Sequence, residues 1–104
     1  MAKNTTILEG TILNEPKLRS TRSGVDVSNF TLMIEGEELN SSFKIGITAW
    51  GKSAVECAFR LKRGARVCVN GKLGMRSRVL YVDGVPEKII EEMEVQAENV
   101  FSVS

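Results

Sequence analysis

Apolar and polar residues alternate in several separate segments of the chain, which predicts a protein built mainly of β-strands. The first run, residues 5–13, is rich in residues that favour β-strands, and Gly10 in its middle predicts a bend that lets one strand serve two parts of a sheet. Pro16 ends this run, because proline cannot donate a hydrogen bond to a ladder. A polar turn at residues 20–24 leads into a second run at residues 25–34, so the two runs predict a hairpin.

The third run, residues 43–50, divides its residues between two sides of a predicted strand. One side is apolar and is expected to face the core; it holds Ile45, Ile47 and Ala49. The other side holds Lys44, Gly46, Thr48 and Trp50. Two interpretations of Trp50 stay open here. It is either an exposed aromatic that stacks unpaired bases beside lysines, or a large residue of the core.

A short helix is predicted at residues 53–63. Ser53 and Glu56 have the spacing of a capping box, and Gly64 is a typical C-terminal cap. Small and apolar residues share one face, which favours a helix that closes the end of a sheet: Ala54, Cys57, Ala58 and Leu61. The cations near its end either offset the helix dipole or contact phosphate, and both interpretations stay open: Arg60, Lys62 and Arg63.

Two more strands are predicted after the helix. The fourth begins at residues 66–73, where Gly71 interrupts an apolar row and so predicts a bulge, a bend or a close backbone approach. The turn signal at residues 83–84 predicts the tip of a hairpin arm. Pro86 is expected to interrupt the returning chain, which closes with a strand at residues 93–101.

Length and element order indicate a single domain spanning residues 1–104. Five strands with a helix between the third and the fourth are the order of an oligonucleotide-binding fold. The sequence therefore predicts an all-β protein with one short helix, folded as a five-stranded OB-fold barrel.

The net charge of +1 would by itself argue against a nucleic-acid partner, but the charges are segregated along the chain. Residues 44–78 hold nine basic residues and one acidic residue, whereas residues 79–104 hold one basic and six acidic residues. This segregation predicts a basic face on a nearly neutral molecule. Arg76 and Arg78 lie two apart, so an extended arm would direct both to the same side, unless the arm is simply a solvated surface.

Several classes of function are disfavoured. The chain has no histidine, so an enzyme would lack an ordinary general base near neutral pH, and we expect no catalytic residues. Its two cysteines form neither a zinc spacing nor a disulfide framework, and we expect reduced thiols in a cytoplasmic protein with no metal and no cofactor. No export signal or membrane-length apolar run is present, so no membrane partner is expected.

Five segments, in this order along nearly the whole chain, resemble the bacterial single-stranded DNA-binding protein family: residues 8–19, 29–32, 49–52, 61–64 and 67–73. The resemblance implies an OB-fold that assembles into homodimers or homotetramers through its first strand. It also implies sequence-independent binding of single-stranded DNA during DNA replication, recombination or repair, in the cytoplasm with the nucleoid. The short chain also resembles primosomal replication protein N, a dimeric restart factor, which would make replication-restart proteins partners.

The resemblance implies a binding set of one aromatic and several cations, namely Trp50, Lys52, Arg63, Arg76 and Arg19. The charge pattern adds Lys44 and Arg78 to this predicted set, and Tyr81 is a candidate substitute aromatic.

Three positions depart from the family. Glu38 stands where an aromatic is frequent, and Arg78 stands where a Trp is common. A third aromatic position falls on Lys44 or, with a shift of one residue, on Phe43. Each lost stacking partner removes about 1–3 kcal/mol, so weaker binding that depends more on charge is expected.

The family's long acidic tail has no counterpart before Ser104, so we expect the protein to coat or hand over DNA rather than recruit partners by that route. Two alternatives stay open. An OB-fold module for protein interaction is favoured by the acidic loop around Glu37 and disfavoured by the basic stretch. Binding of RNA is the other, because stacking and phosphate contacts do not distinguish the two sugars.

Overall fold

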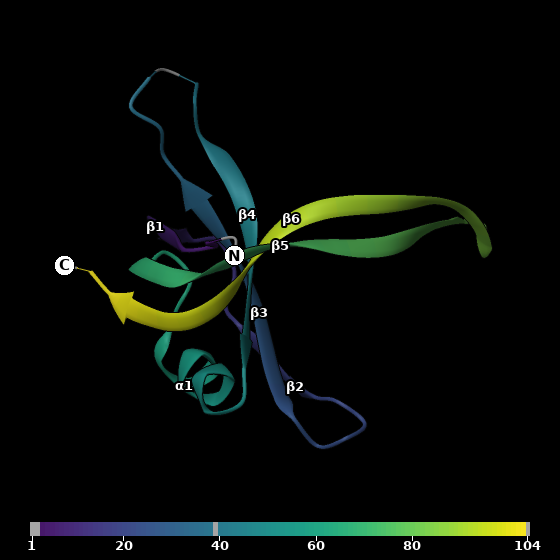
Figure 1. The fold of residues 1–104 in the computed structure, drawn as a ribbon, viewed down its shortest axis with the longest axis horizontal. Helices are drawn as coiled ribbons and strands as arrows, with labels where there is room; N and C mark the ends of the chain where they lie inside the picture. The colour runs from purple at the N-terminus through teal and green to yellow at the C-terminus, as the bar shows by residue number, and fades with distance from the viewer. Residues whose placement is uncertain (1–2, 39, 104) are drawn as a thin grey trace.

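The computed structural model describes residues 3–38 and 40–103, which form six strands and one helix (Figure 1). In chain order these are β1 (Thr6–Ile12), β2 (Lys17–Ser20), β3 (Asp26–Ile34), β4 (Phe43–Trp50), α1 (Lys52–Arg60), β5 (Arg66–Val82) and β6 (Val85–Ser102). The short β2 was not predicted as a separate strand. The other five strands follow the predicted order, with the helix between the third and the fourth of them.

The strand pairings form a ring. From β1 they pass through β5, β6, β4 and β3, and the end of β1 then pairs with β3 at Thr11 and Ile12. All of these pairings are antiparallel except that between β4 and β6. The predicted role of β1 is confirmed, because its first part pairs with β5 and its end also reaches β3. Gly10 lies at this crossing, where a Cβ would clash with the carbonyl oxygen of Met33.

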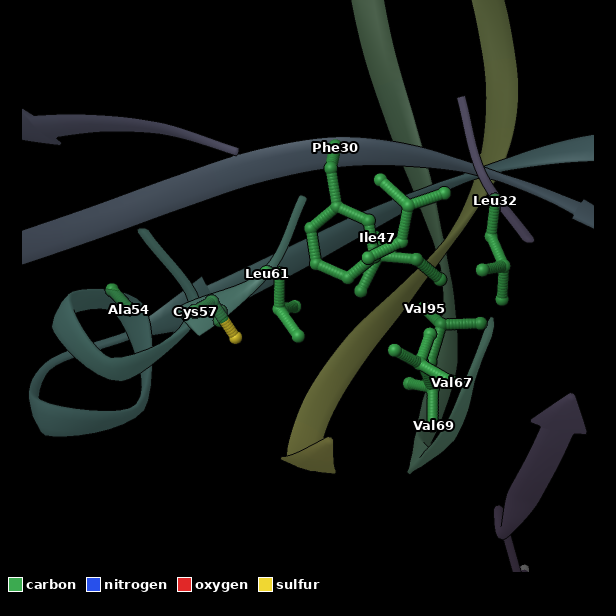
Figure 2. Close-up of a cluster of buried hydrophobic side chains, with 11 residues drawn as sticks. Phe30, Leu32, Ile47, Ala54, Cys57, Leu61, Val67, Val69 and Val95 are labelled. Carbon is green, nitrogen blue, oxygen red and sulfur yellow. The ribbon is translucent and has the colours of Figure 1, made fainter. Parts of the chain in front are cut away.

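The core lies inside the ring, where the inner rows of the strands meet the helix (Figure 2). Alternation directs every second side chain inward, and the buried strand residues include Phe30, Leu32, Ile47, Val67, Val69 and Val95. The helix adds Ala54 and Cys57, and its C-cap residue Leu61 is buried in the same cluster, as the spacing of the small and apolar residues predicted. Trp50 is not part of this core, since 46% of its surface is exposed, and the interpretation of Trp50 as a core residue is wrong.

The helix begins one residue earlier than predicted, and its N-terminal cap differs. Gly51 is the N-cap, and among the described residues no side chain caps the first turn. The predicted capping box of Ser53 and Glu56 is therefore wrong. The chain leaves β4 at Trp50 and enters the helix at Lys52, which places Ser53 inside the first turn instead of before it.

The helix also ends three residues earlier than predicted, at Arg60. Leu61 is the C-cap, with extended backbone angles, and its side chain is buried in the core. Gly64 is not the cap, because its N–H donates to the carbonyl of Ile12 at 2.7 Å, and the N–H of Ile12 donates to the carbonyl of Ala65 at 2.9 Å. These bonds to β1 take the chain out of the helix before the cationic residues that follow Leu61.

β5 and β6 form a long hairpin arm that projects on the opposite side of the molecule from α1 and the C-terminus (Figure 1). The predicted bulge at Gly71 is confirmed by a register shift between Asn70 and Gly71. The predicted interruption at Pro86 is wrong, because β6 runs without a break from Val85. Pro86 lies opposite Tyr81, beside a second irregularity in the ladder, where the missing N–H of proline is tolerated.

Replacing Gly71 with alanine should destabilise the fold, because the new Cβ would meet the main chain of Gln96 and Ala97. Overpacking against backbone costs about 1–3 kcal/mol. The matched control is Gly46→Ala on β4, where a Cβ meets nothing within 4 Å. Urea unfolding should show a lower midpoint for Gly71→Ala and a change within about 0.5 kcal/mol for Gly46→Ala. Equal midpoints for the two variants would contradict the close packing of β5 on β6.

Candidate nucleic-acid interface

An open groove lies on the outer side of the strand ring, between β2, β3 and β4 and the base of the arm. It consists of two hollows of about 740 Å³ and about 340 Å³, both lined by Asn29, Thr48, Arg76 and Glu94. We call this surface the central groove. Its cationic lining consists of Lys17, Arg19, Lys44 and Arg76, and its acidic lining of Glu92 and Glu94.

The strand register explains why these side chains converge. Thr48 and Trp50 occupy the outer row of β4, because Ile47 and Ala49, which alternate with them along the strand, are buried in the core. On β3, Asn29 lies opposite Thr48. The antiparallel β2 sets Lys17 opposite Asn29 and Arg19 opposite Val27, and from there the Arg19 side chain reaches Asn29. On the other side, β6 runs parallel to β4 and sets its own outer row next to Thr48.

A chain of hydrogen bonds crosses the groove floor through six side chains on four strands, which we call the polar chain: Arg19, Asn29, Thr48, Glu94, Gln96 and Trp50. Arg19 donates to Asn29 Oδ1 at 2.6 Å, and Asn29 Nδ2 donates to Thr48 Oγ1 at 2.9 Å. The Thr48 hydroxyl donates to Glu94 Oε2 at 3.0 Å. Gln96 Nε2 donates to Glu94 Oε1, and Trp50 Nε1 donates to Gln96 Oε1 at 2.6 Å.

Four of the residues predicted from the sequence come together at the central groove: Trp50, Arg19, Arg76 and Lys44. Lys44 lies near the turn that joins β3 and β4, and Trp50 lies at the other end of the same strand. The groove therefore offers an indole at one end and cations along its length. Phe43, the alternative aromatic position, also lines the groove and is half exposed.

The other four predicted residues lie outside the groove lining. Lys52 lines a separate hollow of about 670 Å³ between α1 and the end of β6, where Glu56 and Glu98 balance its charge and that of Arg60. Arg63 is exposed in the turn between α1 and β5, and Tyr81 is exposed near the tip of the arm. Arg78 lies on the arm, where its Nε is 3.0 Å from Glu92 Oε1.

Sequence reasoning missed several residues of this surface: Lys17, Asn29, Thr48, Glu92, Glu94 and Gln96. Lys17 could have been predicted as part of this surface, because it precedes Arg19 by two positions and therefore points to the same side of a strand. Alternation placed Thr48 on the side of the strand that holds Trp50, but the roles of Asn29, Thr48 and Gln96 depend on which strands are neighbours. The parallel contact of β4 with β6 joins residues that are far apart in the sequence.

Cys57 is a free thiol that is buried in the core. Burial raises the pKa of the Cys57 thiol above its ordinary value, more than the hydrogen bond with Ser53 lowers it, and the charge of Glu56 raises it further. The thiol therefore stays protonated at neutral pH and is a poor nucleophile. Among residues 3–38 and 40–103, no cluster of three or more His, Cys, Asp or Glu side chains is placed to hold a metal ion. No helix in the same residues is long and apolar enough to cross a membrane.

The fold is similar to that of a solved structure, the SSB domain of a Synechococcus sp. protein. The two share 20% sequence identity and superpose with a TM-score of 0.76 over 96% of each chain. The predicted OB-fold class is confirmed by this similarity together with the strand order.

Sequence comparison gives the same relationship. A single-stranded DNA-binding protein of Halalkalibacterium halodurans is 32% identical over 102 residues, which are 93% of this chain and 58% of the relative. Single-stranded DNA-binding protein 1 of Chlorobaculum tepidum is 38% identical over 81 residues, which are 71% of this chain and 50% of the relative. The chain thus spans about half the length of these relatives. The model of the single-strand binding protein family matches residues 3–100. The chain therefore belongs to the single-strand binding protein family, as the resemblance of its segments indicated.

Proposed function

We propose that the protein binds single-stranded DNA without regard to sequence, through the central groove and without a chemical step. One observation supports this function most directly. The half-exposed indole of Trp50 stands at the end of a groove lined by the cations Arg19, Arg76 and Lys44. Family membership and the names of the two bacterial relatives support the same function.

Each part of the groove has a physical role in this proposal. A base stacks on the exposed indole, which accepts any base because every base has a π-face, and such a contact contributes about 1–3 kcal/mol. The cations follow the phosphates and release counterions as the strand binds. Phe43 is the candidate for a second stack at the far end of the groove. With so few aromatics, charge contributes a large share of the affinity.

The carboxylates of the groove moderate this attraction. Glu92 is engaged by Arg78 in an exposed ion pair, and such pairs contribute at most about 1 kcal/mol, so a phosphate can exchange for Glu92 at little cost. Arg78 then becomes available to the strand as it leaves the groove along the arm. Lys52, Arg63 and Tyr81 remain proposed contacts for a longer strand that passes beyond the groove.

We also propose that chains assemble with one another through β1. Within the described residues, only Thr11 and Ile12 of β1 pair with β3, so the edge of residues 6–10 that faces away from β5 has no strand beside it. Ile7 on this segment is 66% exposed. An open strand edge is a template for pairing with a second chain. An assembled coat of this kind serves DNA replication, recombination or repair, and replication-restart proteins are partners to which the strand would be passed.

Replacing Trp50 with alanine should weaken binding of a labelled oligo-dT by about fivefold to a hundredfold, because one stacked base is lost. The matched control is Phe59→Ala, which removes an aromatic that is 76% exposed on α1 and outside the groove lining. Fluorescence anisotropy titrations should show weaker binding for the first variant alone. Unchanged affinity of folded Trp50→Ala would contradict the stacking role, and an oligo-U titration would show whether RNA binds equally well.

Replacing Arg76 with alanine should flatten the dependence of affinity on salt. Each lost phosphate contact lowers the slope of log K against log salt by about 0.7 for a single strand. Lys62→Ala, which removes an equal charge from the turn after α1, is the control and should leave the slope unchanged. Titrations of oligo-dT at four or more salt concentrations give both slopes. An equal salt dependence of affinity in the two variants would mean that Arg76 does not contact a phosphate.

Replacing Ile7 with aspartate should shift the assembly toward single chains, because a symmetric pairing of β1 edges would bring the new charges together beside Glu9. The control is Ile89→Asp, the same change at a residue of the arm that is 69% exposed. Analytical ultracentrifugation measures the mass of each variant. A wild-type mass of one chain, or an assembly unaffected by Ile7→Asp, would rule out pairing through β1.

A further inference from the structure

We infer that Gln96 is a positioning residue for Trp50, which holds the indole in the orientation that stacks a base. This inference rests on the proposed binding of single-stranded DNA at the central groove and deepens it. Gln96 is neither cationic nor aromatic, and it lies on a strand 46 residues from Trp50 in the chain. It nevertheless accepts the indole N–H at 2.6 Å, at the boundary between the groove floor and solvent.

The orientation of the Gln96 amide is set by Glu94. An ionised carboxylate only accepts hydrogen bonds, and Glu94 accepts one from Gln96 Nε2 and another from the Thr48 hydroxyl. With its NH₂ group engaged by Glu94, the amide of Gln96 presents its carbonyl oxygen to the indole. An indole N–H can only donate, so the two groups match in this one orientation.

The position of Gln96 is fixed by its neighbours on both sides. On one side, the parallel register of β4 and β6 places Gln96 next to Thr48. On the other, β5 approaches so closely at Gly71 that a Cβ there would clash with the Gln96 carbonyl. The main chain of Gln96 is therefore held between two strands, and its side chain points outward to meet Trp50.

This arrangement prepares the indole for binding. Trp50 is 46% exposed while its N–H is bonded to Gln96, so part of the indole surface is available to a base without breaking this bond. A side chain that is ordered before binding loses less conformational freedom when the ligand arrives, and the affinity rises accordingly. Gln96 thus contributes to DNA binding through Trp50, without having to touch the DNA.

A double-mutant cycle tests this role. Gln96→Met keeps the length of the side chain but removes the acceptor, and Trp50→Phe keeps an aromatic ring but removes the donor. Oligo-dT affinity should fall by about threefold to tenfold for Gln96→Met in the wild-type background, the range expected for one hydrogen bond. In the Trp50→Phe background the same change should cost less than about twofold. Gln96→Leu repeats the cycle with a second apolar side chain.

The fluorescence of Trp50, the only tryptophan of the chain, gives an independent readout. Without DNA, acrylamide should quench Gln96→Met more strongly than the wild type, and its fluorescence anisotropy should decay faster, because the indole is no longer held. The circular dichroism spectrum should stay unchanged.

The outcomes separate the two proposals. A Gln96→Met affinity equal to that of the wild type, or an equal loss in both backgrounds, would overturn the positioning role while Trp50 keeps its stacking role. If Trp50→Ala binds oligo-dT as tightly as the wild type, the stacking proposal fails, and the role of Gln96 fails with it.

Discussion

The structure depends on the parallel contact between β4 and β6, which joins two parts of the chain that are far apart in sequence. Only three residue pairs define this contact, and one of them, Ile47 with Val95, is buried in the core. The pairs on either side, Gly46 with Glu94 and Thr48 with Gln96, belong to the outer face. One short ladder thus completes the ring of strands around the core and brings the two halves of the polar chain together.

The central groove is lined by both cations and carboxylates, and the two have different roles. Its cations come from β2, β4 and β5, and its carboxylates come from β6 alone. Glu94 does more than repel phosphate, because both of its oxygens accept hydrogen bonds from neighbouring side chains. A carboxylate whose oxygens are engaged in this way orders the floor of the groove. Lys44 and Arg76 come from the basic segment of the sequence and Glu92 and Glu94 from the acidic one, so the groove brings both signs of charge together.

Much of the fold could be predicted from local pattern. Alternation identified the inner residues Ile47 and Ala49, and Gly71 marked the bulge, because period and glycine placement are local properties. The helix ends could not be predicted in this way. Gly64 has the local character of a cap, but its hydrogen bond to Ile12 depends on a strand about fifty residues away in the chain. Pro86 was misread for a similar reason, since its tolerance depends on the irregular ladder opposite Tyr81.

The candidate site could be predicted in part for the same reasons. Residue type alone was enough to predict the aromatic and cationic residues of the groove, because stacking and phosphate contact need such side chains. These residues are Trp50, Arg19, Arg76 and Lys44. Lys52 follows Trp50 closely in the chain, but the start of α1 turns it toward a different hollow. Gln96 and Glu94 gave no signal, because their roles exist only where β6 meets β4.

In the proposed complex, unpaired DNA lies in the central groove against the indole of Trp50. Titration of ¹⁵N-labelled protein with oligo-dT, followed by NMR, locates the bound strand. We expect the single indole N–H resonance to shift together with the amides of β2, β3, β4 and the base of the arm. Shifts confined to the hollow between α1 and β6, with an unmoved indole resonance, would contradict it.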